Sequence, residues 1–325
     1  PNIYGLVTSS GYFLGIDVKR AHINMRLIDL QKNEVHVSNF IPYHLENSLG
    51  SLEQLFSIIE NFIKTSPVKR DKIFGVGVSL SGRINNSTGQ SYNSFHFSEE
   101  PLIKVMERSI GIPVILENDS RAMVFGEFEL SKTTPGESVL FLNMDYGIGV
   151  GIMLDGQIYY GKSGFSGEIG HIPFFDNDII CTCGKKGCLE TEASGWALVK
   201  KVKEKIREGS SSILSSHEID EIKLRDVIEA AHKDDVLAIE LIAELGEKIG
   251  RGIAVLINVF NPETVILGGS LAETGEYIRL PIKSTLNKYS LSLVNNDTEV
   301  KMSELGDQSG VIGISLLVRE RFLEG

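Results

Sequence analysis

GEIGHIPFFDNDIICTCGKKGCLE, residues 167–190, is the stretch that decides how this chain is interpreted. It contains His171 and all three cysteines of the chain, Cys181, Cys183 and Cys188. One imidazole and three thiolates are a common tetrahedral zinc set, and the two glycines between the last cysteines allow tight turns around one ion. An odd, closely grouped set of cysteines is more typical of metal ligands than of disulfides. We therefore expect a structural zinc site, with three buried free thiols and a surface histidine as the alternative.

Strands and helices alternate on both sides of this stretch. A glycine-rich hairpin is expected from Tyr12, turning near Lys19-Arg20, and a second one opens at SVLFLNMD, residues 138–145. Interleaved strands and helices predict an α/β fold, and two halves that each open with such a hairpin predict two lobes with a cleft between them. The other expected elements are helices over 51–64, 101–110, 195–208, 224–233 and 235–259, strands ending at Gly82 and Gly268, and a last helix after Gly310.

Composition excludes several classes of function. The 325 residues carry a formal net charge of −11, from 32 basic and 43 acidic side chains. A DNA-binding face must neutralise several phosphates with Lys and Arg, so this chain alone is not predicted to be that face. No apolar run approaches the roughly 18–20 residues of a membrane span, and no basic-then-apolar leader is present. We expect a cytosolic protein without a membrane partner, and, because the chain begins at Pro1, a missing upstream segment.

Five motifs together resemble the ROK family, which takes its name from repressors, open reading frames and kinases. Their order and spacing fit the family over most of the chain. The resemblance implies an actin-like ATPase or sugar-kinase fold, which is ribonuclease H-like, with a sugar held between two α/β lobes. The motifs are GVGVSLSG at 75–82, LENDSRA at 116–122, GEIGH at 167–171, CTCGKKGCLE at 181–190 and NPETVILGG at 261–269.

The resemblance also implies a division of the chain. Residues 1–11 would connect to a missing N-terminal module, as in family repressors that carry a helix-turn-helix there. Residues 12–120 and 306–325 would form a small lobe, and residues 121–305 a large lobe with the zinc motif. Loops over 81–100 and 160–166 would shape the specificity for the sugar.

In the family the sugar is held by residues that match Asn118, Asp119, Glu168, His171 and Glu190. Carboxylates accept strong hydrogen bonds from sugar hydroxyls, and a histidine with one nitrogen on zinc has its other nitrogen fixed in direction. Asp119 also matches the general base of the family's kinases. Plainer interpretations exist: Asn118-Asp119 could simply cap a helix, the two glutamates could be solvated, and His171 could serve the zinc alone.

The first phosphate loop of the family's kinases is altered in this chain. That loop resembles Asp-x-Gly-Gly-Thr, whereas here Asp17 is followed by Val18, Lys19, Arg20 and an alanine. A phosphate cradle needs backbone N–H groups at close approach, which glycine allows and long side chains obstruct. Lys19 and Arg20 could, alternatively, bind an anion themselves.

The second loop is altered too. The kinases resemble Gly-Thr-Gly-x-Gly-Gly-Gly, whereas this chain has DYGIGVG at 145–151. Gly147 and Gly149 are kept, but Asp145 and Tyr146 replace a glycine and the threonine. Asp145 would repel a triphosphate, and phosphoryl transfer depends almost wholly on positioning and charge stabilisation.

We therefore expect the sugar-sensing and oligomerisation part of a NagC/XylR-type repressor. Its partners would be a sugar or sugar-phosphate effector, operator DNA through the missing module, and other copies of itself in a homodimer or homotetramer. The alternative is an ATP- and Mg²⁺-dependent kinase of the glucokinase or N-acetylhexosamine kinase type, with Asp119 as its base. A third possibility is a sugar-binding protein without a DNA function.

Overall fold

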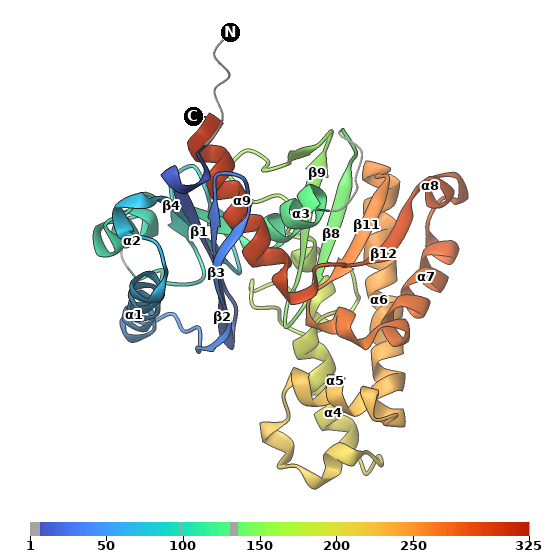
Figure 1. The fold of residues 1–325 in the computed structure, drawn as a ribbon. Coiled ribbons are helices and arrows are strands. Elements are labelled where there is room, and N and C mark those ends of the chain that lie inside the picture. Colours follow the sequence, from blue (N-terminus) through green and yellow to red (C-terminus); the bar gives the residue numbers. More distant parts are fainter. Residues whose placement is uncertain (1–6, 98, 131–135, 325) are drawn as a thin grey trace. The chain divides into compact units, whose positions relative to one another are not determined.

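The computed structural model of the chain describes residues 7–97, 99–130 and 136–324 (Figure 1). The chain forms two compact units, each with its own five-stranded sheet and its own apolar core. The predicted α/β class is confirmed. Part of the expected connector, residues 1–6, lies outside the described residues, and Thr8–Ser10 form a 3-10 turn. The first unit comprises Pro1–Thr133, Ile158–Ser166 and Gln308–Gly325, and the second comprises Thr134–Gln157 and Gly167–Asp307.

The sheet of the first unit has the order β3-β2-β1-β4-β7. The first three strands of the chain are antiparallel, and β4 and β7 continue the sheet in parallel with β1. Helices α1 and α2 cover the core on one side, and α9 packs against β1 and β4 (Figure 1). The bounds are β1 Tyr12–Val18, β2 His22–Asp29, β3 Glu34–Pro42, α1 Leu49–Thr65, β4 Ile73–Leu80, β5 Ile84–Asn85, β6 Gln90–Ser91, α2 Leu102–Ile110, β7 Val114–Asn118, α3 Asp119–Leu130 and α9 Ser309–Glu324.

Close backbone approach explains why α9 belongs to this unit although it ends the chain. A Cβ atom added to Gly15 of β1 would lie 2.7 Å from Ser315 of α9. One added to Gly126 of α3 would lie 2.5 Å from the Ser309 carbonyl oxygen. These two glycines therefore let α9 lie directly on β1 and α3. The contact with α9 places α3 in the first unit, whereas we expected the boundary at residue 120.

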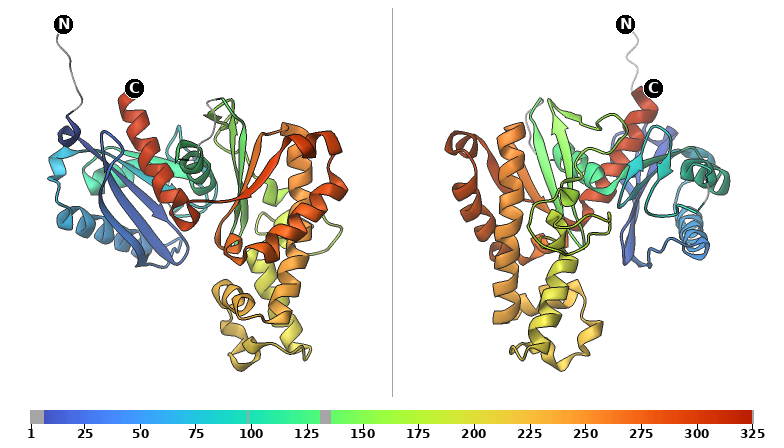
Figure 2. Two further views of the ribbon diagram at one scale, coloured as in Figure 1. Left: turned by 45° about the vertical axis from the view of Figure 1, so that its right-hand side comes forward. Right: turned by 180° about the vertical axis from the view of Figure 1, so that it is seen from behind.

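The sheet of the second unit has the order β10-β9-β8-β11-β12. Strands β8 and β9 form the expected second hairpin, and a turn at Asp155-Gly156, with positive φ at both residues, leads from β9 into β10. Both views of Figure 2 show α4 and α5, in yellow to orange, at one end of the long α6. The bounds are β8 Val139–Met144, β9 Ile148–Leu154, β10 Gln157–Ile158, α4 Gly195–Arg207, α5 Leu224–His232, α6 Val236–Phe260, β11 Thr264–Gly268, α7 Glu276–Tyr289, α8 Ser292–Asp297 and β12 Glu299–Met302.

None of the helices in the described part of the chain combines the length and the apolar composition that a membrane span requires.

Candidate functional site

The predicted metal ligands lie together in the second unit. One ligand atom from each of His171, Cys181, Cys183 and Cys188 lies within 4.8 Å of the other three. The Sγ atoms of Cys183 and Cys188 are 3.6 Å apart, and Cys181 Sγ is 3.4 Å from His171 Nδ1. Around a tetrahedral zinc with bonds of about 2.3 Å, two sulfurs stand roughly 3.8 Å apart. The donor set and its spacing therefore fit one zinc ion.

Short backbone bridges bring these ligands together. Isolated β-bridges join Pro173 to Cys188 and Ile180 to Lys186, so the segment folds back on itself. Gly184 and Gly187 both have positive φ, at 84° and 69°. The two glycines differ in their surroundings, because a Cβ on Gly187 would lie 2.0 Å from the Phe175 carbonyl oxygen and one on Gly184 would meet nothing within 4 Å.

This difference gives a matched pair of variants. We expect Gly187→Ala to lower metal content and thermal stability clearly, because it adds a backbone clash to the strain of a positive φ. Gly184→Ala carries only the strain, which costs on the order of 1 kcal/mol. Metal analysis and thermal unfolding of both purified variants measure the contrast, and equal behaviour of the two would contradict the described turn.

Burial controls the chemistry of the thiols. Burial raises the pKa of the Cys181 thiol to about 12, with neighbouring Glu190 adding to the rise. A backbone N–H of Lys185 lowers the pKa of Cys183. A thiol with a raised pKa keeps its proton at neutral pH unless a bound cation displaces it. A zinc ion would supply the positive charge that holds the cysteines as thiolates.

Two carboxylates flank the metal ligands. Glu190 is buried, and its Oε1 lies 3.0 Å from Cys181 Sγ and 3.5 Å from His171 Nδ1. On the other side of the imidazole, Nε2 is 3.7 Å from Glu168 Oε2. The structure thus brings together Glu168, His171 and Glu190, with one ring nitrogen toward a cysteine and the other toward a carboxylate.

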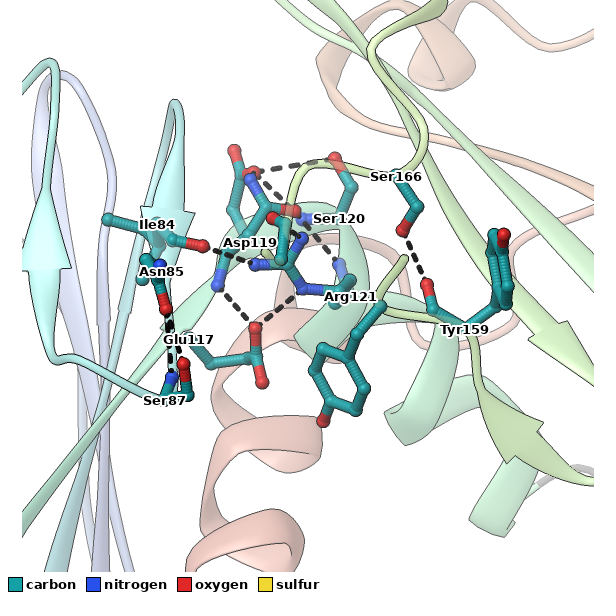
Figure 3. Close-up of polar contacts among 12 residues, drawn as sticks. Ile84, Asn85, Ser87, Glu117, Asp119, Ser120, Arg121, Tyr159 and Ser166 are labelled. Carbon is teal, nitrogen blue, oxygen red and sulfur yellow. Dashed lines mark hydrogen bonds and ion pairs between the residues drawn. The ribbon is translucent and has the colours of Figure 1, made fainter. Parts of the chain in front are cut away.

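Asn118 and Asp119 lie in the first unit, where β7 ends and α3 begins. The Asn118 amide donates to the Gly82 carbonyl and to Asp119 Oδ1, both at 2.9 Å, and accepts from the Arg121 N–H at 3.2 Å. Asp119 Oδ1 also accepts from the Ser120 N–H at 2.8 Å (Figure 3). Both amide hydrogens of Asn118 are therefore used within the protein. Asn118 caps α3 and orients the Asp119 carboxylate, and its contact with a sugar remains a prediction.

At the first altered loop, the Asp17 carboxylate is fully buried and contacts other parts of its own unit. Its Oδ1 accepts from the Ser79 hydroxyl at 3.0 Å, and its Oδ2 is 3.8 Å from Lys19 Nζ. A Cβ on Gly310 would lie 2.4 Å from the same Oδ2, so the carboxylate lies against the first turn of α9. This placement favours the helix electrostatically. Arg20, next to Lys19, is exposed.

At the second altered loop, the Asp145 carboxylate accepts hydrogen bonds from a backbone N–H and a hydroxyl. Asp145 Oδ1 accepts from the Tyr146 backbone N–H at 2.7 Å, and Oδ2 accepts from the Ser270 hydroxyl at 2.8 Å. Gly147 closes the turn by accepting the Asp145 N–H at 3.1 Å, and Gly149 lies within β9 opposite Asn143. Backbone N–H groups and hydroxyls are the donors that a phosphate would use. In this chain, two such donors are bonded to the Asp145 carboxylate instead.

One group of residues beside Asp119 was not predicted from the sequence. Glu117 and Arg121 form a buried ion pair at 2.6 Å, and Arg321 and Tyr160 join it from elsewhere in the first unit. Within LENDSRA, the i, i+4 spacing of Glu117 and Arg121 was the available signal, because oppositely charged residues at this spacing can pair. Nothing in the local pattern pointed to Arg321 or Tyr160.

Comparison with known proteins gives consistent results. The model of the ROK family matches residues 13–321. The chain is 29% identical over 312 residues to the xylose repressor of Caldicellulosiruptor bescii, covering 95% of this chain and 78% of the repressor. It is 28% identical over 322 residues to the glucokinase of Halalkalibacterium halodurans, covering 96% of both chains.

A solved structure described as a ROK family transcriptional regulator, homolog of the E. coli MLC protein, matches with a TM-score of 0.81 and 27% identity. The match covers 96% of this chain and 78% of that one. Together with the two α/β units, this likeness confirms the predicted actin-like, sugar-kinase class of fold. The relatives include both repressors and a kinase, so the two functions have to be distinguished by the residues of the two altered loops.

Proposed function

The chain belongs to the ROK family, and from that premise we propose that it senses a sugar for a transcriptional regulator and does not phosphorylate the sugar. Asp145 carries this proposal. Its carboxylate accepts from the Tyr146 N–H and the Ser270 hydroxyl, two donors of the kinds that bind phosphate oxygens. A negative charge in the same place also repels a triphosphate. A kinase accelerates phosphoryl transfer by positioning the phosphate and stabilising its charge, and the Asp145 carboxylate in this loop works against both.

We propose Asp119, Glu168, His171 and Glu190 as the residues that bind the sugar, with Asn118 orienting Asp119. Acceptor carboxylates beside an imidazole suit a ring of hydroxyl groups. Zinc on His171 and the three cysteines would fix the imidazole and the backbone around Glu190. The effector would be a hexose-type sugar, free, N-acetylated or phosphorylated.

In a regulator of this kind, the sugar would act by binding one conformation more tightly than another, which changes the affinity for operator DNA. A dimer or tetramer with twofold symmetry would match a palindromic operator. Reduced cysteines that bind zinc agree with a cytosolic location. We propose operator DNA and further copies of the chain as partners because several of the relatives are repressors.

The second candidate function, an ATP- and Mg²⁺-dependent hexose kinase, is favoured by the glucokinase match over 96% of both chains. Under it Asp119 would accept the proton of the attacking hydroxyl. A general base contributes roughly 10²- to 10⁴-fold and acts only on a correctly placed phosphate.

One experiment separates the two functions. Xylose, glucose, N-acetylglucosamine and the 6-phosphates of the two hexoses are added singly to the chain, with and without ATP and Mg²⁺. We expect at least one sugar to raise the melting temperature, because a ligand at 100 times its Kd adds about 2.7 kcal/mol of stability. Glu168→Gln should weaken that shift. ATP should add no stabilisation and yield no ADP above the blank. Sugar-dependent ADP formation that Asp119→Asn abolishes would establish the kinase instead.

A further inference from the structure

A buried polar network lies directly beside Asp119. Glu117 is fully buried and Arg121 is 2% exposed. Arg121 Nε donates to Glu117 Oε1 at 2.6 Å, while its two terminal nitrogens donate to the carbonyls of Gly164 at 2.7 Å and Ile84 at 3.1 Å. Figure 3 shows Arg121 between Glu117 and Ile84, close to Asp119. One side chain of α3 therefore holds both loops that we expected to shape sugar specificity.

The last helix joins the same network. Arg321 of α9 donates to Glu117 Oε2 at 3.1 Å and to the Tyr160 hydroxyl at 2.9 Å. The guanidinium carbons of Arg121 and Arg321 lie 5.5 and 5.8 Å from the centre of the Tyr160 ring. Two cations thus share one carboxylate, and the aromatic ring and two backbone carbonyls offset the remaining charge.

Tyr160 acts in this network as a neutral hydrogen-bonding group. Burial, followed by the nearby Glu117 carboxylate, raises the pKa of Tyr160 to about 12. The hydroxyl keeps its proton at physiological pH, and its oxygen accepts the bond from Arg321. The position of segment 158–166 is therefore linked to α9 by a hydrogen bond that does not change with pH in this range.

The residue after Arg321 continues the connection to the first strand. The Phe322 ring lies 6.2 Å from that of Phe13 in β1, and Phe13 lies 6.2 Å from Phe74 in β4. A Cβ on Gly75 would stand 2.5 Å from the Phe322 ring, and one on Gly11 would stand 2.1 Å from the Phe74 ring. Phe13 is fully buried, whereas Phe322 and Phe74 are 37% and 42% exposed, so the Phe322–Phe13 contact joins the last turn of α9 to a buried ring of β1.

We propose that Arg321 and Tyr160 are positioning residues that couple sugar binding at Asp119 to the last turn of α9 and the start of β1. A sugar bonded to Asp119 and resting against segment 158–166 would fix that segment. Arg321 would follow through Tyr160 and Glu117, and Phe322 would pass the displacement to Phe13. This inference rests on the proposed sugar-sensing function and names the route by which binding is communicated.

Hydrogen–deuterium exchange on the 325-residue chain tests the route. The probe is whichever of xylose, glucose, N-acetylglucosamine or the two hexose 6-phosphates raises the melting temperature. In the wild type we expect the sugar to slow exchange over both 158–166 and 319–323. Tyr160→Phe should keep the protection over 158–166 and reduce that over 319–323 at least about fivefold, the lower range of allosteric coupling. Tyr159→Phe is the matched control, since Tyr159 is 46% exposed, and it should behave as the wild type.

Arg321→Lys is the second variant. It keeps a positive charge near Glu117 but loses the planar fork that serves two partners, so we expect the same loss over 319–323. A merely structural role would speed exchange in both segments without sugar and leave the sugar-induced change intact, which would overturn the inference. Protection confined to 158–166 in the wild type would overturn it as well, while leaving sugar sensing in place. If no sugar of the panel bound, sugar sensing itself would fail, and the coupling with it.

Discussion

Replacing Cys188 with serine is expected to release the zinc and to cause the largest loss of stability of any single change proposed for the second unit. Cys188 is fully buried, and its sulfur lies 3.6 Å from that of Cys183. Serine is a poor zinc ligand, and the free energy of structural zinc binding is on the order of 10 kcal/mol in small zinc domains. The loss of one ligand should remove a substantial part of it. Elemental analysis should fall from about one zinc per chain toward none.

Lys185→Ala provides the control, since Lys185 is an exposed residue of the same loop whose side chain is not a ligand. It should retain the zinc and melt close to the wild type. A chelator added to the wild type should reproduce the effect of Cys188→Ser on the melting temperature. Full zinc content in Cys188→Ser, or an unchanged melting temperature after the metal has been removed, would refute the structural metal site.

Replacing Glu117 with alanine is expected to destabilise the first unit by about 3–5 kcal/mol, the usual cost of leaving a buried charge without its partner. Arg121, which is 2% exposed, and the partly buried Arg321 would both lose the carboxylate that they share. Two units can unfold separately, so the effect should be followed by exchange of first-unit amides in increasing urea.

Glu129→Ala is the matched control within α3. Glu129 pairs with Lys32 at 2.6 Å, but both side chains are partly exposed. A surface pair of this kind contributes about 0–1 kcal/mol. Equal costs for the two variants would show that the Glu117 network is solvated, contrary to the structure.

The metal cluster was predictable because its four ligands lie between residues 171 and 188, and a sequence motif records such short-range spacing. The β8–β9 hairpin was predictable for the same reason, because its two strands are neighbours in the sequence. Strand β3 was missed although Glu34–Pro42 alternates polar and apolar residues in part, because its half-buried, edge position weakens that pattern.

The Glu117 network could not have been found from local patterns. Arg321 is 204 positions away from Glu117. Tyr160 belongs to the short segment 158–166, which is part of the first unit although the chain before and after it belongs to the second unit. Only the packing of α9 on α3 and β1 brings them together. The helix-capping role of Asn118 was foreseen as an alternative, but its amide bond to Asp119 depends on side-chain geometry that the sequence does not contain.

The carboxylate of Asp145 has a physiological consequence. The activity of a sugar kinase depends on the concentrations of both its sugar and adenine nucleotide, because it binds the two. A sensor in which a carboxylate such as that of Asp145 occupies the hydrogen-bond donors of the nucleotide loop would respond to the sugar alone. Under the proposed function, transcription controlled by this protein would follow the availability of the carbon source and stay constant while the energy charge of the cell rises and falls.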